Sequence, residues 1–257
     1  MLPQRRRLQF QGSRGHTLAA RLDEPADSPR AYALFAHCFT CTKDLKAANW
    51  ISRELVDRRI ALLRFDFTGL GESAGDFADT NFTSNLDDLV AAADFLRAEY
   101  RAPQILIGHS LGGTAVIAAA ERIPEAVAIA TIAAPSETGH LHEFLTRQTP
   151  ELGADESAEV DVMGRPVRIK GQLLDDLGAH DIRRDVAELH LPILVLHSPE
   201  DEVVSIEHAR RIFEAAPYPK SFVSLDGTDH LLVAREADAR YAAEVIAAWA
   251  SRYLPNS

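Results

Sequence analysis

The stretch Gly108–Gly113 constrains the fold of this chain more than any other. It reads Gly-His-Ser-Leu-Gly-Gly, follows the apolar run Gln104–Ile107 and precedes the alanine-rich, helix-favouring segment Thr114–Arg122. A serine flanked by glycines at such a junction is typical of a nucleophile elbow, where a buried strand turns sharply into a helix. Glycine is needed because a Cβ atom there would clash with the adjoining strand and helix. The free N–H groups at the start of the helix would then suit an oxyanion beside Ser110.

Strand patterns and helix patterns alternate along most of the chain. Strand patterns occur at Leu8–Phe10, Thr17–Leu22, Tyr32–Ala36, Ala61–Phe65, Gln104–Ile107, Val127–Ile132, Ile193–His197 and Ser221–Leu225. Helix patterns occur at Asp44–Arg59, Ser84–Tyr100, Leu111–Arg122, Ile206–Ala216 and Glu236–Tyr253. This order predicts an α/β fold with a mostly parallel eight-stranded sheet flanked by helices, the first two strands being antiparallel at one edge. Ligands bind at the carboxyl ends of such strands.

The alternation is interrupted between about residues 135 and 188, within what we expect to be a single domain of residues 1–257. The interruption is polar and acidic around Thr149–Asp161. Two alternating runs within Val160–Ile169, joined by Met-Gly-Arg-Pro, predict a hairpin. We expect a small cap insertion, with a disordered linker as the alternative for its first half. Four apolar side chains are candidates for lining a substrate pocket under this cap: Leu141, Phe144, Met163 and Leu173.

Two strand-end loops later in the chain hold candidates for a base and an acid. A serine hydroxyl needs both to become nucleophilic, and behind an elbow they follow in the order Ser, Asp or Glu, His. Asp201 follows the strand pattern Ile193–His197, with Glu200 and Glu202 as rivals. His230 follows the next strand pattern, whereas other histidines lie in the elbow (His109), a strand end (His197) or the cap (His140, His142). The order therefore predicts a triad of Ser110, Asp201 and His230.

Two backbone N–H groups are expected to form an oxyanion hole. One belongs to the residue after the nucleophile, Leu111, and the other to the loop after an early strand, where Phe39 is the best-placed residue. Removing one such donor typically lowers the rate by about a hundredfold or more.

Cys38 and Cys41 are the only cysteines and have the spacing C-x-x-C. A zinc site would need two more ligands at suitable spacing, which the sequence lacks, and a thioredoxin-like redox pair is a second alternative. We expect two reduced thiols in a loop whose backbone matters more than its sulfur atoms. The segment Gly69–Ala74 fits a dinucleotide fingerprint, but no helix follows it directly, so no nicotinamide or flavin cofactor is expected. We expect no metal and no organic cofactor.

The composition is that of a globular protein, with 46% hydrophobic and 25% charged residues. A formal charge of −11 without a basic face argues against nucleic-acid or anionic-membrane partners. The cluster Arg5–Arg7 lacks the apolar region and cleavage site of a secretion signal, and no apolar run approaches the length of a membrane span. A cytoplasmic location is the default expectation.

With these motifs the chain resembles an α/β-hydrolase from end to end. The segment Asp66–Ser73 is similar to the D-x-x-G-x-G-x-S loop of that superfamily. The segments Ala36–Asp44, Arg64–Ser73 and Ser221–Gly227 more closely resemble the hydrolase half of bacterial α/β-hydrolase/OsmC-like fusion proteins. Cys38 stands where the superfamily usually has glycine, and no OsmC-like module follows Tyr253, so a longer parent chain that carries one is left open.

The resemblance implies a serine esterase that acts on small-molecule esters of small to medium acyl groups. The alternatives are a thioesterase, a peptidase for small amides, and a non-catalytic ligand-binding or redox module that uses the same pocket or the cysteine pair. Neither the physiological substrate nor the oligomeric state follows from the sequence, and a homodimer is left open.

Overall fold

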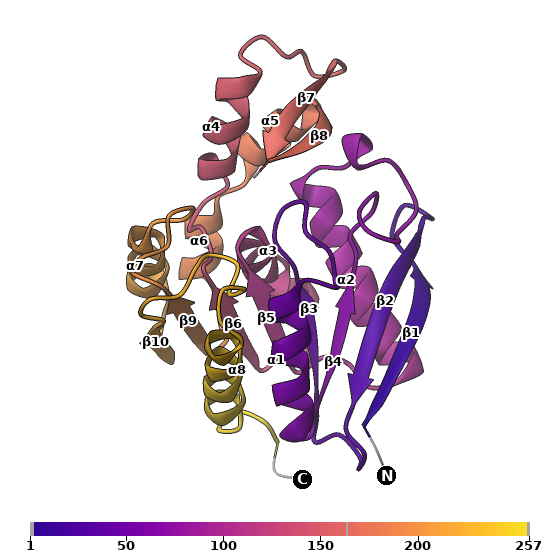
Figure 1. The fold of residues 1–257 in the computed structure, drawn as a ribbon, viewed down its shortest axis with the longest axis vertical. Coiled ribbons are helices and arrows are strands. Elements are labelled where there is room, and N and C mark those ends of the chain that lie inside the picture. Colours follow the sequence, from indigo (N-terminus) through magenta and orange to yellow (C-terminus); the bar gives the residue numbers. More distant parts are fainter. Residues whose placement is uncertain (1–2, 163, 256–257) are drawn as a thin grey trace.

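A twisted eight-stranded sheet forms the centre of the molecule (Figure 1). The computed structural model describes residues 3–162 and 164–255. Its strands, in chain order, are β1 (Gln4–Gln11), β2 (Thr17–Glu24), β3 (Ala31–Ala36), β4 (Ile60–Phe65), β5 (Ile105–His109), β6 (Ala128–Ile132), β9 (Ile193–His197) and β10 (Lys220–Ser224). Their order in the sheet is β1-β2-β4-β3-β5-β6-β9-β10. Strand β2 is antiparallel to both of its neighbours, β1 and β4, and the remaining pairs are parallel, which confirms the predicted fold class.

Helices cover both faces of this sheet (Figure 1). They are α1 (Lys46–Asp57), α2 (Phe82–Glu99), α3 (Leu111–Ala119), α7 (Ile206–Ala215) and α8 (Glu236–Ala250). Helices α1 and α8 pack on one face and α2, α3 and α7 on the other, so the core consists of two apolar clusters separated by the sheet. Strands β3, β5, β6 and β9 are buried along their whole length, because parallel strands between two helical layers expose neither face. That burial explains why their sequences are largely apolar.

Most of the chain between β6 and β9 forms a layer above the carboxyl ends of the strands, and its last helix packs beside α3 and α7 (Figure 1). It contains α4 (Gly139–Gln148), the hairpin β7 (Ser157–Val162) and β8 (Arg165–Lys170), α5 (Gln172–Ala179) and α6 (Ile182–Ala187). The predicted hairpin is present, but it extends beyond Val160–Ile169 and runs from Ser157 to Lys170. The structure describes helices or strands in both halves of the insertion, so the linker alternative is wrong. The buried side chains Leu145, Val160, Ile169 and Leu173 join this layer to the apolar cluster of α2 and α3.

Polar contacts hold the insertion against the segment that leads into α2. The Asn81 side chain donates to Gln172 at 2.9 Å, and Thr83 Oγ1 donates to Asp176 Oδ1 at 2.6 Å. Ion pairs also join Arg168 to Asp76 and Lys170 to Asp79. The cap is therefore fixed to one side of the sheet's carboxyl edge.

Candidate active site

Ser110 occupies the bend between β5 and α3 in a conformation that few residues adopt. Its φ is 53° and its ψ is −128°, a strained combination for any residue with a Cβ atom. A Cβ on Gly108 would lie 2.2 Å from the carbonyl oxygen of Gly112, and one on Gly112 would lie 2.3 Å from the carbonyl oxygen of Ala36. Both positions accept only glycine, because the bend presses helix α3 against β5 and β3. The predicted elbow is present.

His230 links the elbow serine to a carboxylate on another loop. Its Nε2 lies 3.0 Å from Ser110 Oγ and its Nδ1 lies 2.7 Å from Asp201 Oδ2. An ionised carboxylate can only accept, so Nδ1 carries the proton and Nε2 is free to accept one from the serine. All three side chains are buried or nearly so. The structure thus brings together the three side chains that the sequence predicts, from loops after β5, β9 and β10.

Asp201 is held in place and kept ionised by its surroundings. Burial acts to raise its pKa, but the hydrogen bond and charge of His230 and the N–H groups of Val203 and Val204 together lower that pKa below its usual value. These two N–H groups donate to Oδ1 at 2.8 and 2.9 Å. The rival Glu200 instead accepts from the N–H of Gly227 at 2.8 Å, and Glu202 is exposed.

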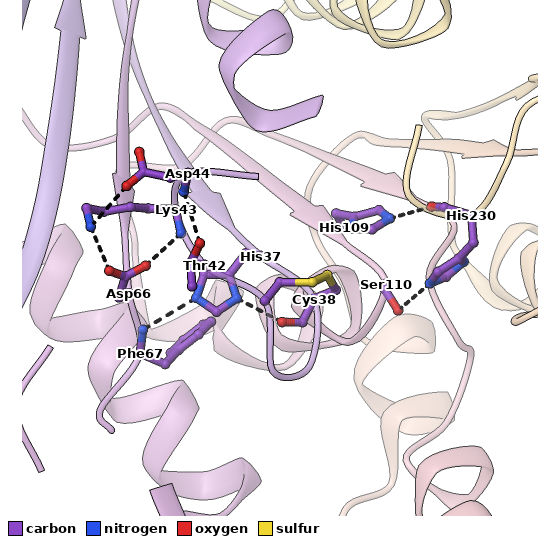
Figure 2. Close-up of a disulfide and its surroundings, with 11 residues drawn as sticks. His37, Cys38, Thr42, Lys43, Asp44, Asp66, Phe67, His109, Ser110 and His230 are labelled. Atoms are coloured by element: carbon purple, nitrogen blue, oxygen red, sulfur yellow. Dashed lines mark hydrogen bonds and ion pairs between the residues drawn. A yellow bond between two sulfur atoms is a disulfide. The ribbon is translucent and has the colours of Figure 1, made fainter. Parts of the chain in front are cut away.

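Two other buried histidines, His109 and His197, hold the loops that carry His230 and Asp201. Chain order places both of them outside the triad. His109 Nε2 donates to the carbonyl oxygen of His230 at 2.7 Å (Figure 2), and His197 Nε2 donates to that of Val204 at 2.7 Å. A carbonyl oxygen accepts only, so each ring holds its proton on Nε2. Burial, with the nearby His230 adding to it, lowers the pKa of His109 to about 3, and burial also lowers the pKa of His197. Both rings are neutral supports for the triad, and only the fold reveals that role.

The two residues predicted to supply the oxyanion donors, Leu111 and Phe39, line the same narrow pocket. Leu111 occupies the first position of α3, where a backbone N–H has no acceptor within the helix. Phe39 lies in the loop after β3, with its ring 5.5 Å from that of Phe77. Twelve residues line the pocket, most of them apolar: His37, Cys38, Phe39, Thr40, Phe67, Leu70, Phe77, Phe82, Asn85, Leu111, Gly112 and Ala115. The space beside Leu111, the residue after the serine, therefore favours an apolar group.

Cys38 and Cys41 are joined in a disulfide, so the prediction of two reduced thiols is wrong (Figure 2). The loop turns tightly between them: the N–H of Cys41 donates to the carbonyl of Cys38 at 3.1 Å, and Thr40 has a φ of 60°. This turn brings the two Cα atoms to 5.3 Å, within the range that a disulfide requires. C-x-x-C spacing alone does not specify such a turn.

Of the four predicted pocket residues of the cap, the structure describes three, and these three do not line the narrow pocket. Leu173 is buried in the apolar cluster that the cap shares with α2 and α3, Leu141 is partly buried, and Phe144 is 39% exposed. None of these three lines the pocket at the elbow, and Met163 falls outside the described residues. The side chains lining the pocket belong instead to the loop after β3, the segment before α2, and helices α2 and α3. The contribution of the four cap residues to substrate binding stays a prediction.

The segment Gly69–Ala74 is a turn that is packed on a buried carboxylate. A Cβ on Gly71 would lie 2.3 Å from Asp66 Oδ2, and the N–H of Glu72 donates to that same oxygen at 3.0 Å. A short 3₁₀ turn, Phe77–Asp79, comes next in the chain.

Within residues 3–162 and 164–255, no three His, Cys, Asp or Glu side chains gather as ligands of a metal ion would. None of the helices in that part combines the length and apolar character that crossing a bilayer requires.

Comparisons with known proteins agree with this architecture. The structure superimposes on the esterase domain of a Rhodothermus marinus protein with a TM-score of 0.81 and 47% identity, covering 98% of this chain and 100% of that one. It also superimposes on Est1E from Butyrivibrio proteoclasticus, solved with ferulic acid, with a TM-score of 0.82 over 96% and 98% of the two chains. At 20% identity this second likeness concerns the fold alone.

Relatives found by sequence include the mitochondrial palmitoyl-protein thioesterase ABHD10 of Rattus norvegicus. It is 26% identical over 170 residues, which is 62% of this chain and 54% of that protein. The chain spans about 60% or less of the length of the curated relatives it matches first. A model of the alpha/beta hydrolase family matches residues 33–244, well over half of the chain. The chain therefore belongs to the alpha/beta hydrolase family.

Proposed function

We propose that the protein is a serine hydrolase that cleaves carboxylic esters of small to medium acyl groups through an acyl-enzyme. The observation that carries this proposal is the continuous contact from Ser110 through His230 to Asp201. A serine in contact with the unprotonated nitrogen of an imidazole, itself oriented by a carboxylate, is the arrangement that activates an alcohol as a nucleophile. The 47% identity to an esterase domain supports the choice of esters.

In the proposed mechanism, Ser110 Oγ attacks the ester carbonyl carbon while His230 Nε2 accepts the hydroxyl proton. The oxyanion of the tetrahedral intermediate accepts hydrogen bonds from the N–H groups of Leu111 and Phe39. Collapse of the intermediate breaks the bond to the alkoxy oxygen, which leaves as the alcohol with the proton from His230. A water molecule then attacks the acyl-enzyme by the same route and releases the carboxylic acid. Asp201 stays ionised throughout and stabilises the charged imidazolium.

The narrow apolar pocket beside Leu111 supports an acyl group of limited size. A series of 4-nitrophenyl esters from acetate to decanoate tests this expectation. We expect kcat/KM to be highest among the short and medium chains and to fall as the chain outgrows the pocket. A maximum at the longest chains would contradict it.

Substitutions in the triad test the reaction itself. Ser110→Ala should lower kcat for a chromogenic butyrate ester by a factor of about 10⁴ or more, because the nucleophile is removed. Asp201→Asn should lower kcat by up to about 10⁴, because an amide no longer selects the imidazole tautomer with a free Nε2. Glu202→Gln is the matched control, since this neighbouring exposed carboxylate should change activity less than twofold. Full turnover by Ser110→Ala would refute a serine nucleophile.

A thioesterase is the second candidate, because relatives named palmitoyl-protein thioesterase match more than half of the chain. The same triad hydrolyses an oxygen ester or a thioester, so the alternatives differ only in preference. Comparing kcat/KM for an ester, a thioester and an anilide of one acyl group measures that preference. We expect the ester to exceed the anilide strongly; a thioester advantage of tenfold or more would favour the second candidate.

A further inference from the structure

The Cys38–Cys41 disulfide encloses one of the two expected oxyanion donors. Phe39 lies inside the four-residue ring that the disulfide closes, in the loop directly after β3. The chain has no other cysteine. A thiol reagent that acts on cysteine therefore acts on this pair alone.

This loop lies directly against the elbow. Strands β3 and β5 are neighbours, with Ala36 opposite Gly108. The carbonyl oxygens of Ala36 and His37 come so close to Gly112 that a Cβ there would lie 2.3 and 2.5 Å from them. Cys38, Phe39 and Thr40 line the same pocket as Leu111. A shift of the turn would consequently move the Phe39 N–H relative to the serine.

Both ends of the loop are fixed by buried polar contacts (Figure 2). On one side, His37 Nδ1 donates to the carbonyl of Cys38 at 2.8 Å, and the N–H of Phe67 approaches His37 Nε2 at 3.5 Å. On the other side, the N–H and the Nζ of Lys43 both donate to Asp66, at 2.6 and 2.7 Å. Between these anchors, the turn has one backbone hydrogen bond, from Cys41 to Cys38, and the disulfide.

The turn contains a conformation that the disulfide helps to maintain. Thr40, a β-branched residue, has a φ of 60°, and residues with a Cβ atom rarely have a positive φ. Without the covalent link, a single hydrogen bond would have to hold Thr40 there. We expect the opened turn to relax toward ordinary backbone angles, which reorients the adjacent peptide groups, including the N–H of Phe39.

We propose that the Cys38–Cys41 disulfide positions the Phe39 N–H for the oxyanion, so that opening the disulfide lowers turnover. This inference rests on the proposed serine-hydrolase function. A dithiol serves as the reductant that opens the disulfide. Its thiolate attacks the sulfur of Cys41, which is partly exposed, and Cys38, only 4% exposed, leaves as a thiolate. The second thiol of the reagent then displaces Cys41, so that two electrons pass to the pair and the reagent becomes a disulfide.

The test compares oxidised and reduced forms of the whole chain. Protein purified without reductant should show no thiols with Ellman's reagent, and two after treatment with dithiothreitol and its removal under argon. Removal matters because free thiols cleave 4-nitrophenyl esters themselves. We expect kcat for the butyrate ester to fall about tenfold to a hundredfold on reduction, with KM changed less than threefold, since displacing a transition-state donor by about 1 Å costs up to that much.

If the disulfide only stabilises the fold, opening it should lower the melting temperature without specifically weakening the binding of the transition state. A second readout is therefore needed. A trifluoromethyl ketone forms a hemiketal oxyanion on the serine, and its affinity should fall by the same factor as kcat/KM. The double variant Cys38→Ser with Cys41→Ser should have the same low kcat as the dithiothreitol-treated wild type, and dithiothreitol should not change it. Reoxidation of the wild-type chain should restore the original kcat.

Four results would overturn the proposal. They are free thiols in the purified protein, reduced protein with two thiols and undiminished kcat, a reductant response in the double variant, and an unchanged ketone affinity. Failure of the proposed function gives a different pattern, namely a Ser110→Ala variant that keeps full turnover or a serine that a fluorophosphonate probe does not label. The two failures are therefore distinguishable.

Discussion

Ser110 illustrates how backbone strain at a single residue is maintained by its neighbours. A φ of 53° with a ψ of −128° in a residue with a side chain costs about 1–3 kcal/mol. Its N–H donates to the carbonyl of Ile132 at 2.9 Å, and its own carbonyl accepts from Gly113 at 2.8 Å. These bonds to β6 and α3 hold the bend, and the bend holds Oγ within reach of His230.

His109 contributes a pH dependence to the stability of the fold. Its folded-state pKa of about 3 lies below the ordinary value of 6.5, because burial disfavours the charged ring. Above pH 6.5 the ring is neutral in the folded and unfolded states alike. As the pH falls from 6.5 toward 3, the unfolded chain binds a proton that the folded chain does not. The free energy of unfolding therefore decreases by up to about 1.4 kcal/mol per pH unit from this group.

Replacing His109 by Gln should remove this contribution while keeping a donor for the His230 carbonyl. We expect the wild type to lose more stability than His109→Gln between pH 6.5 and 4.5, with slopes that differ by about one proton. Urea unfolding at half-unit pH intervals measures both slopes. Equal slopes would mean that His109 does not stay neutral in the folded state. The pKa of His37 is also lowered by burial, so some slope remains in both proteins.

Among the elements, the contact of α3 with the end of β3 determines the geometry of the site. This contact has no room for a side chain at Gly112, where a Cβ would lie 2.3 Å from a backbone oxygen. Backbone atoms cannot move aside as a flexible side chain can. A change at this contact therefore displaces the helix start, the loop after β3, or both.

Gly112→Ala should therefore lower kcat/KM by about a hundredfold, because the predicted oxyanion donors lie on the two segments it pushes apart. It should also destabilise the fold by about 1–3 kcal/mol. Gly178→Ala in α5 is the matched control, since no atom lies within 4 Å of its added Cβ. That variant should keep full activity and be as stable as the wild type, or more stable by up to about 1 kcal/mol. Kinetics and urea unfolding of both variants check these expectations.

Across the molecule as a whole, the cap is part of the same apolar core as helices α2 and α3. Leu145 of α4 is fully buried, whereas its neighbour Phe144 is 39% exposed. The ion pairs between the cap and the segment before α2 are exposed, and such pairs contribute little each. The cap therefore depends on buried apolar contacts for its position.

Leu145→Ala should destabilise the protein by about 2–5 kcal/mol, because it leaves a cavity in the shared core. Phe144→Ala should cost about 1 kcal/mol or less, because much of this side chain already faces solvent. Denaturant unfolding measures both changes. If Phe144 also binds substrate, as its place in the cap sequence predicts, its variant will raise KM; an unchanged KM would reject that role. Similar losses of stability for the two variants would contradict the described packing.

The fold class and the three side chains of the triad follow from the amino-acid sequence alone. Uninterrupted apolar runs such as Ile105–Ile107 must lie between two covering layers, so they predict a parallel sheet with helices on both faces. Parallel strands place their following loops at one edge, so chain order is enough to predict that Ser110, Asp201 and His230 meet there. The glycines around Ser110 confine the bend to one kind of turn. These inferences rest on local patterns and on the order of the elements.

Which residues lie next to one another in the folded chain is determined by the structure and not by sequence patterns. The disulfide follows from the left-handed turn at Thr40, which C-x-x-C spacing does not encode. His109 supports the triad because the loop after β10 passes directly over it. The pocket forms from residues after β3 and around α2 and α3, whereas the cap candidates Leu141 and Phe144 lie elsewhere. The contacts of His109 and of the pocket join segments that are far apart in the chain, and neither segment's sequence identifies the other, so tertiary packing alone determines them.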